Sequence, residues 1–470
     1  MDKLRFAIHT LGCKVNTYES DIISEQMRKA GFEETEFNMP ADIYIINTCT
    51  VTNMADRKSR QMLHKAKKNN NEAIVVAVGC YVDAAVKNPK MQEILSESEI
   101  DLLITNREKE RTAEIIIDYI NKNKALEFGL KNDEDIVVSC SFETGGSSLG
   151  ELDDHTRAFI KVQDGCNQFC SYCIIPYVRG QIKSRPEDDI LKEVKALSKK
   201  GVKEFIITGI HLSSYGKDFF QKSLPDGEKR VPGDDIMNSS KAPLLSLISA
   251  INSIPEVKRI RLGSLEPRLI SREFIEELKK NDKLCPHFHL SLQSGSDRIL
   301  KSMNRHYTKE EYRECCRLLR EFYEHPAITT DIIVGFPGET EEDFLESLNF
   351  LKEIGFYEAH VFKYSKREGT IASKMPNQVN DNIKNERSKK LIEAAEEYSG
   401  IFRKYYFKKN VSFIAEQHVI IDGEKYISGY TDEYVRCLKK SDSFIRGRVE
   451  SGVADRIINK KDIDESLLLI

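Results

Sequence analysis

The sequence lacks any long apolar run and any strong excess of one charge. No stretch of its 470 residues approaches the roughly 18 apolar residues of a membrane helix, and the N-terminus, MDKLRFAIHTLGCKVN, has too little continuous apolar sequence for a signal peptide. We therefore expect a cytoplasmic protein with no membrane partner. The formal net charge of −4 argues against nucleic-acid binding over the whole surface, so any RNA contact must come from local basic patches.

Internal repeats and low-complexity segments are also missing, and the pattern of the chain changes twice. The first region, residues 1–124, alternates short apolar runs with helical patterns, which is typical of a parallel α/β sheet. Its expected strands are residues 5–10, 42–47, 73–78 and 101–105. A polar stretch rich in Gly and Ser, residues 132–154, is predicted to be a linker.

The second region, residues 152–402, repeats a strand-then-helix pattern six times. The expected strands are residues 158–162, 204–208, 259–262, 287–292, 329–334 and 359–364. Six such units fit a partial (β/α)6 barrel, which is related to the closed barrel of eight units. A polar stretch at residues 214–243 is predicted to be a surface loop insertion without an assigned role.

The third region, residues 403–470, contains short strand patterns with turns between them: VSFIAEQ, EKYISGYT, EYVRCLKK and SFIRGRVESG. This spacing predicts a small antiparallel β-barrel similar to an oligonucleotide-binding fold. The predicted fold class is therefore α/β, with a parallel N-terminal domain, a partial central barrel and a small antiparallel C-terminal barrel.

The most specific motif is a cysteine triplet, Cys166, Cys170 and Cys173, directly after the first strand of the central barrel. Thiolates are the normal ligands of iron–sulfur clusters, and three of them leave one iron of a [4Fe–4S] cubane open for a small molecule. The alternatives are a zinc site or a chance cluster. Zinc sites usually use paired C-x-x-C units and four protein ligands, which this loop does not provide.

Three scattered cysteines, Cys13, Cys49 and Cys80, share a structural position, because each follows a predicted strand of the first region. In a parallel sheet their thiols would emerge along one edge, where α/β folds bind ligands. Gly12 and Gly79 would let the backbone come close to a cofactor. The alternative is three buried cysteines. The other five of the eleven cysteines show no ligand spacing and are expected to be structural: Cys140, Cys285, Cys315, Cys316 and Cys437.

The triplet, with Tyr172 before its last cysteine, resembles the radical S-adenosylmethionine (SAM) superfamily. The segments TLGCKVNTYESD, NTCTVT and VGCY resemble the N-terminal domain of the radical SAM methylthiotransferases. Further segments are similar to that family: TGIHLSSYG, RIRLGSLEP, HLSLQSGSDRILKSMNRHYT and TDIIVGFPGET. The resemblance implies that Cys13, Cys49 and Cys80 hold an auxiliary [4Fe–4S] cluster, and that the C-terminal barrel is an RNA-binding TRAM module.

The resemblance also implies a reaction and a set of partners. Two [4Fe–4S] clusters and two SAM molecules per turnover would be needed. The cluster on the triplet would cleave SAM to a radical, and the auxiliary cluster would carry the sulfur. An electron donor such as flavodoxin or ferredoxin and a sulfur source would be partners. Candidate SAM contacts, besides Tyr172, are residues at strand ends: Gly209, Ser264, Glu266, Gln293 and Gly335.

The substrate is suggested by the residues around the first cysteine, which read Gly12-Cys13-Lys14-Val15-Asn16. This segment resembles the subgroup that acts on N6-threonylcarbamoyladenosine (t6A) at position 37 of tRNA and forms its 2-methylthio derivative. The alternatives are the same chemistry on isopentenyladenosine or on a ribosomal-protein aspartate. A non-catalytic iron–sulfur protein that binds RNA is a further alternative, but it would ordinarily give each cluster four protein ligands.

Contact with tRNA is expected from an aromatic and basic set in the last region: Tyr434, Arg436, Lys439, Lys440, Arg446 and Arg448. Such sets hold loop RNA by stacking and by pairing with phosphates. The basic helix DRKSRQMLHKAKK is a second candidate, although a solvated charged face explains it better.

Overall fold

The computed structural model describes residues 3–96, 99–127, 156–221, 234–460 and 463–470. The chain forms two compact units. Unit 1 takes residues 1–151, 165–168 and 173–181, and unit 2 takes residues 152–164, 169–172 and 182–470. The predicted linker at 132–154 and Cys140 lie outside the described residues. Within the described ranges, no helix combines the length and the apolar character needed to cross a membrane.

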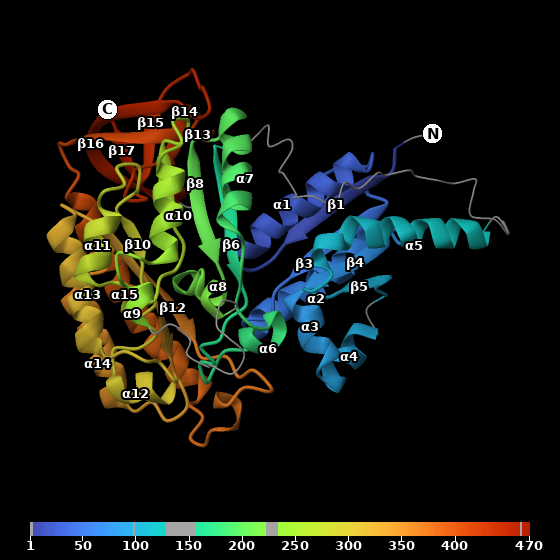
Figure 1. The fold of residues 1–470 in the computed structure, drawn as a ribbon, viewed down its shortest axis with the longest axis horizontal. Coiled ribbons are helices and arrows are strands. Elements are labelled where there is room, and N and C mark those ends of the chain that lie inside the picture. Colours follow the sequence, from blue (N-terminus) through green and yellow to red (C-terminus); the bar gives the residue numbers. More distant parts are fainter. Residues whose placement is uncertain (1–2, 97–98, 128–155, 222–233, 461–462) are drawn as a thin grey trace. The chain divides into compact units, whose positions relative to one another are not determined.

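Unit 1 is built on a five-stranded parallel sheet with the order β2-β1-β3-β4-β5. Figure 1 labels β1, β3, β4 and β5 of this sheet. Its strands are β1 (Arg5–Thr10), β2 (Glu33–Glu34), β3 (Ile43–Thr48), β4 (Ile74–Gly79) and β5 (Leu102–Ile104). Its helices are α1 (Lys14–Lys29), α2 (Asn53–Asn69), α3 (Cys80–Val86), α4 (Pro89–Ser96), η1 (Lys109–Arg111), α5 (Thr112–Glu127) and α6 (Ile175–Arg179). The four predicted strands are confirmed. Strand β2 was not predicted, because its two exposed glutamates carry no apolar pattern.

The sheet of unit 1 is buried on both faces. On β3, Ile43 and Ile45 pack with α1 and α5, whereas Tyr44 and Ile46 pack with residues of α2 and α3. Because successive side chains of a strand point to opposite faces, a strand covered on both sides reads as a continuous apolar run. This explains why the run from Ile43 to Ile46 identified the strand in the sequence.

Unit 2 contains the six predicted parallel strands, together with the short antiparallel strand β7, in two sheets with the orders β7-β6-β8-β9 and β10-β11-β12. Bridges from Ile260 to Leu284 and from Leu265 to Leu290 join the sheets, and in the described residues no pairing joins β12 to β6. The partial barrel is thus confirmed. Its strands are β6 (Arg157–Asp164), β7 (Lys183–Ser184), β8 (Glu204–Gly209), β9 (Arg259–Leu262), β10 (His287–His289), β11 (Ala327–Val334) and β12 (Glu358–Lys363).

The helices of the partial barrel include five long ones and several short ones. The long helices are α7 (Glu187–Lys199), α10 (Pro243–Asn252), α13 (Lys309–Phe322), α14 (Glu341–Ile354) and α15 (Asp381–Lys404); the shorter ones include α11 (Arg272–Leu278) and α12 (Asp297–Ser302). Two predictions need correction. Strand β10 ends at His289, because the chain after it bridges first to Leu265 and then to Ile332. The expected loop at 214–243 contains helices α8 (Lys217–Gln221) and α9 (Asp234–Met237), and Met237 is buried.

The C-terminal part of unit 2 is a closed barrel with the strand order β13-β14-β15-β17-β16 (red in Figure 1). Its strands are β13 (Asn410–Ile421), β14 (Glu424–Tyr430), β15 (Arg436–Lys440), β16 (Val449–Lys460) and β17 (Ile463–Leu469). Neighbouring strands are antiparallel, as predicted, except that β15 and β17 are parallel. Strand β17 was not predicted.

The loop between β14 and β15 packs against the amino ends of the barrel strands. Arg261 of β9, whose side chain is 2% exposed, pairs with Glu204 of β8 at 2.7 Å. The same guanidinium donates to the carbonyl oxygens of Thr431 and Asp432, both at 2.6 Å. A buried cation is tolerated when its donors are all engaged, and here the loop supplies the remaining acceptors. We call residues 430–435 the floor loop.

Tyr434 is the aromatic centre of the floor loop. Its ring stacks on His287 at the start of β10, with centroids 5.1 Å apart, and on Tyr430 at 4.5 Å. The guanidinium of Arg157, at the start of β6, donates to the hydroxyl of Tyr434 at 2.9 Å. The floor loop therefore covers the amino ends of the strands, which is the end of the barrel opposite the cysteine triplet.

Candidate functional site

The three scattered cysteines lie at one edge of the unit 1 sheet. Cys13 is the N-cap of α1, Cys49 follows β3, and Cys80 is the first residue of α3, directly after β4. Burial raises the pKa of Cys49 to about 11, amide donors of Val51 and Thr50 oppose this shift, and the charges of Cys80 and Cys13 add to it. The three thiols are therefore within electrostatic reach of one another.

Two glycines permit the close approach of these segments. Gly12 has a φ of +103°, and a Cβ there would lie 2.8 Å from Sγ of Cys49. Gly79 has the same φ, and a Cβ there would lie 3.1 Å from Nζ of Lys109. Any other residue would be strained and would push the strand ends apart. The glycines thus bring parts of this chain together around the thiols.

Arg179 of α6 is directed at one of these thiols. Its Nε donates to Sγ of Cys80 at 3.3 Å, and its side chain is only 1% exposed. Two other residues hold the guanidinium: Glu19 accepts at 2.9 Å and Oδ1 of Asn16 at 2.6 Å. The amide of Asn106 also approaches Sγ of Cys80, at 3.5 Å. Donors to sulfur stabilise the thiolate form and the negative charge of a bound cluster.

The cysteine triplet occupies the loop that follows β6, and all three thiols are half-buried. The turn into this loop requires Gly165, which has a φ of +69°; a Cβ there would lie 1.9 Å from the carbonyl oxygen of Gln181. In unit 2, Arg305 donates from Nη1 to Sγ of Cys170 at 3.3 Å. This arginine is 7% exposed and lies 3.8 Å from a carboxylate oxygen of Glu266.

Glu266 is a buried carboxylate that keeps its charge. Burial raises its pKa, but the hydrogen bond and charge of His211 and the charge of Arg305 outweigh this and lower the pKa to about 2. The His211 contact is 3.1 Å from Nε2, and the other ring nitrogen lies 2.6 Å from the hydroxyl of Ser214. A polar chain thus runs from Cys170 through Arg305 and Glu266 to His211.

The structure distributes the six candidate SAM contacts unevenly. Tyr172 packs with Phe336 and Tyr364, Gln293 is buried with a φ of +71°, and Ser264 is exposed. The two candidate glycines, Gly209 and Gly335, both lie close to neighbouring side chains. The Cβ position of Gly209 is 2.9 Å from Oε1 of Gln163, and that of Gly335 is 2.3 Å from Cγ of Lys384. Both glycines therefore permit the close approach of a neighbouring side chain.

The predicted RNA-binding set divides in two. Tyr434 is wrong as a base-stacking residue, because its ring already packs inside the floor loop. The basic members stay available on the barrel surface: Lys439 and Arg448 both pair with Glu450, and Lys440 pairs with Glu424. Exposed pairs of this kind are weak and can be exchanged for phosphates. Helix α2 buries Asp56, Ser59, Leu63 and Ala66. Its basic residues Arg57, Lys58, Lys65 and Lys68 are exposed, in agreement with a solvated face, whereas Arg60 and Lys67 are half-buried.

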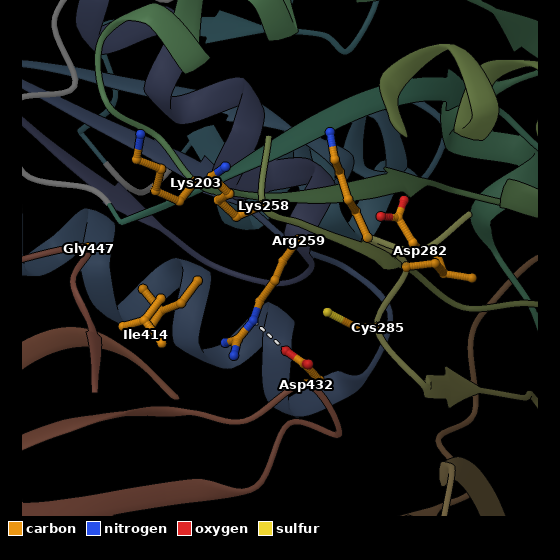
Figure 2. A pocket seen from close by; sticks show the side chains of 11 residues that line it. Lys203, Lys258, Arg259, Asp282, Cys285, Ile414, Asp432 and Gly447 are labelled. Atoms are coloured by element: carbon orange, nitrogen blue, oxygen red, sulfur yellow. Dashed lines mark ion pairs between the residues drawn. The ribbon is translucent and has the colours of Figure 1, made fainter. Parts of the chain in front are cut away.

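A basic cavity of about 290 Å³ lies beside the floor loop (Figure 2). Lys203, Lys258 and Lys283 line it, and an ion pair of 2.5 Å between Arg259 and Asp432 closes one side. These residues precede or begin strands β8, β9 and β10, so the cavity lies at the end of the barrel away from the triplet. It can contribute to a basic surface but not to chemistry at Cys170.

Sequence reasoning missed the polar partners of the thiols: Arg179, Arg305, Glu19 and His211. A weak signal was present for the first two. Arg179 ends the otherwise apolar segment CIIPYVRG, and Arg305 follows the apolar face of α12. A charge placed against a buried segment has to be paired or directed at a ligand. The four expected structural cysteines within the described residues are buried, and burial raises the pKa of Cys285 and Cys315 to about 12.

Comparison with known families agrees with this architecture. Residues 160–351 match the radical SAM superfamily, and residues 5–105 match the uncharacterized protein family UPF0004. A solved structure of a radical S-adenosylmethionine methyltransferase, TsrM from Kitasatospora setae, has a TM-score of 0.51 to this chain at 14% identity, covering 79% of this chain and 77% of that one. The fold and the triplet loop define a radical SAM enzyme.

Comparison with curated proteins narrows the class. The threonylcarbamoyladenosine tRNA methylthiotransferase MtaB of Bacillus subtilis is 37% identical over 94% of this chain and 92% of that enzyme. MtaB of Aquifex aeolicus is 36% identical over 91% of this chain and 96% of that enzyme. The tRNA-2-methylthio-N(6)-dimethylallyladenosine synthase of Caldicellulosiruptor saccharolyticus is 34% identical over 98% of this chain and 87% of that enzyme. The chain therefore belongs to the radical SAM methylthiotransferase family.

Proposed function

We propose that this protein converts t6A at position 37 of tRNA, next to the anticodon, to its 2-methylthio derivative. The similarity to MtaB of Bacillus subtilis along 94% of the chain carries this proposal. The dimethylallyladenosine synthase of Caldicellulosiruptor saccharolyticus, at 34% identity, supports the second candidate, methylthiolation of isopentenyladenosine. Both candidates share one chemistry and differ in the group attached to the adenine.

We further propose that the enzyme holds two [4Fe–4S] clusters and consumes two SAM molecules per turnover. Cys13, Cys49 and Cys80 would ligate the auxiliary cluster. The thiols fit this group, because they converge at one sheet edge and Cys80 receives donors from Arg179 and Asn106. Thiolate ligation with hydrogen bonds to sulfur is the usual environment of such clusters.

Cys166, Cys170 and Cys173 would ligate the second cluster, and its open iron would take SAM. No side-chain base can remove the unactivated hydrogen of the adenine ring at neutral pH; when bound, the clusters and SAM would supply the radical and the transferred sulfur. Arg305 would donate a hydrogen bond to Cys170. Glu266, whose pKa is lowered to about 2 and which is therefore ionised, would keep Arg305 in place. The proposed SAM contacts are Tyr172, Gly209, Ser264, Glu266, Gln293 and Gly335.

The proposed division of labour follows the three regions of the sequence. Residues 1–124 would carry the auxiliary cluster, residues 152–402 the radical SAM core, and residues 403–470 a TRAM module that binds tRNA. The proposed phosphate contacts are Arg436, Lys439, Lys440, Arg446 and Arg448. The reaction requires a low-potential electron donor such as flavodoxin or ferredoxin and a source of replacement sulfur, and we place it in the cytoplasm.

The proposal is tested by nucleoside mass spectrometry. The anaerobically reconstituted enzyme is incubated with SAM, a reductant and tRNA that carries either t6A or isopentenyladenosine. We expect the 2-methylthio product from the first tRNA only. Product from the second tRNA only would move the assignment to the isopentenyladenosine subgroup, and no nucleoside product from either would reject tRNA methylthiolation.

A further inference from the structure

Strands β10, β11 and β12 present a set of polar residues to the interior of the partial barrel. In the register of the sheet, His289 pairs with Thr329, and Asp331 pairs with His360, so these four lie on one face. The opposite face packs on the helix layer. Phe288 contacts Tyr323 with centroids 5.1 Å apart, and other residues of that face are buried. The face with His289, Asp331 and His360 therefore points away from the helices.

This interior face runs from the cysteine triplet to the floor loop. Ile333, two residues beyond Asp331, belongs to the apolar cluster that includes Tyr172 of the triplet loop. At the other end, His287 stacks on Tyr434 of the floor loop. His289, Asp331 and His360, which we call the lumen cluster, lie between these two points. That is where a substrate must lie to react near Cys170.

In the lumen cluster, hydrogen bonds fix the imidazole of His289, whereas in the described part of the chain the imidazole of His360 is not held in this way. Nε2 of His289 lies 3.2 Å from Oδ2 of Asp331, and Nδ1 lies 3.0 Å from the hydroxyl of Thr329. A carboxylate only accepts, so Nε2 carries the proton and Nδ1 accepts from Thr329. Asp331 is thereby held in place from one side.

The remaining polar groups of the lumen cluster point to a ligand. The nearest polar atoms of the three side chains lie within 4.8 Å of one another, and His360 is exposed. Among the described residues, Oδ1 of Asp331 and both ring nitrogens of His360 have no hydrogen-bond partner. The cluster therefore offers one acceptor and one donor, side by side, to a molecule in the barrel interior.

We propose that the lumen cluster binds the threonylcarbamoyl group of the substrate adenosine, an inference that rests on the proposed function. The urea N–H groups of that substituent match the free oxygen of Asp331, and its carboxylate matches an N–H of His360. An isopentenyl group has no polar atoms and would leave both residues unpaired. A site built to hydrogen-bond a substrate rejects an analogue that lacks those groups strongly.

The inference is tested by binding, without turnover. Anticodon stem-loops with t6A or with unmodified adenosine at position 37 are titrated onto the anaerobically reconstituted full-length enzyme and its variants Asp331→Asn and His360→Ala. We expect each variant to weaken binding of the t6A stem-loop by about 10- to 100-fold and to leave the unmodified stem-loop unchanged. Glu276→Gln, which removes an exposed carboxylate from α11, is the matched control and should change neither affinity.

Three results would overturn the inference. One is an equal loss of affinity for both stem-loops, and another is an unchanged preference for t6A in both variants. The third is a stoichiometric divalent metal that wild-type enzyme retains and both variants lose, because two imidazoles and a carboxylate also suit such an ion. Failure of the proposed function is separate, since it appears as absent methylthiolation by wild-type enzyme. Cluster absorbance and the melting temperature confirm that the variants are folded.

Discussion

Arg179 holds its Nε 3.3 Å from Sγ of Cys80, and Arg305 holds its Nη1 at the same distance from Sγ of Cys170. Both arginines are almost fully buried, and each lies beside a glutamate, Glu19 or Glu266. Each of the two cysteine sets thus has one guanidinium directed at one sulfur. A fixed positive charge at this position stabilises the more negative state of a bound cluster.

Replacing Arg179 with Gln is expected to make the auxiliary cluster harder to reduce. The loss of a buried positive charge beside Cys80 lowers the reduction potential and reduces cluster affinity or activity by about 10- to 100-fold. A redox titration followed by electron paramagnetic resonance measures the shift. Arg179→Lys keeps the charge and should shift the potential less. Equal potentials in wild type and Arg179→Gln would contradict the assignment.

Cys49→Ala is expected to separate the two proposed clusters. Iron content should fall from about eight to about four atoms per chain, because one cubane is lost. The variant should still release 5′-deoxyadenosine from SAM but form no methylthio product. Cys170→Ala should lose both activities. Cys285→Ala, a buried cysteine of unit 2, is the control and should keep about eight irons. Full methylthiolation by Cys49→Ala would reject the role of the auxiliary set.

The stability of the protein is expected to depend on Asp21 of α1. Burial raises its pKa from 3.8 to about 7, the charge of Glu34 adds to the shift, and Arg28 opposes it. The folded state therefore binds this proton more tightly, so its contribution to stability is full below about pH 4, falls as the pH rises to about 7, and then stays constant. Asp21→Asn should unfold at a higher temperature than wild type at pH about 8 and should lose this advantage below pH about 4. Parallel melting curves at all pH values would contradict this.

Tyr434→Ala is expected to destabilise the attachment of the C-terminal barrel. It removes a half-buried ring that stacks on His287 and Tyr430, at a cost below the roughly 3 to 5 kcal/mol of a fully buried aromatic truncation. Urea denaturation and limited proteolysis measure the effect. Tyr434→Phe keeps the ring and loses only the hydroxyl contact with Arg157, so it should cost much less. A neutral Tyr434→Ala would show that the floor loop is not held by this ring.

Binding of tRNA is expected to weaken as salt rises, with a slope set by the number of phosphates contacted. Replacing Lys440 or Arg448 with Gln should lower affinity for all tRNAs and reduce the slope by about one unit each. Glu424→Gln, which frees Lys440 from its ion pair, should not weaken binding. Affinity independent of salt would contradict phosphate contacts by the C-terminal barrel.

The sequence predicted the strands best where both faces are covered. Strands β1 and β9 have the predicted ends: β1 contains the apolar run from Phe6 to Ile8, and in β9 Ile260 and Leu262 alternate with two arginines that are buried and paired. Positions of Cys13, Cys49 and Cys80 followed from the same patterns, since parallel strands end at one edge. The two-residue strands β2 and β7 leave no comparable pattern.

The contacts between distant residues could not be predicted in this way. Arg179 is 99 positions from Cys80, and Arg305 is 135 positions from Cys170. The local periodicity of apolar residues, which predicts helices and strands, contains no information about such distant pairs. Tyr434 illustrates the opposite error, because its basic and aromatic neighbours in sequence suggested RNA, whereas its actual partners, Arg157 and His287, come from the starts of barrel strands.

The floor loop gives the C-terminal barrel a structural role in addition to its proposed contact with RNA. Removing everything after Phe402 would expose Glu204 and Arg261 to water and uncover the amino ends of the strands of the partial barrel. A truncated enzyme would then lose activity even on a short substrate that does not depend on RNA binding by the C-terminal barrel. Only point variants that leave the floor loop unchanged, such as those at Lys440, test the proposed RNA contact separately from this structural role.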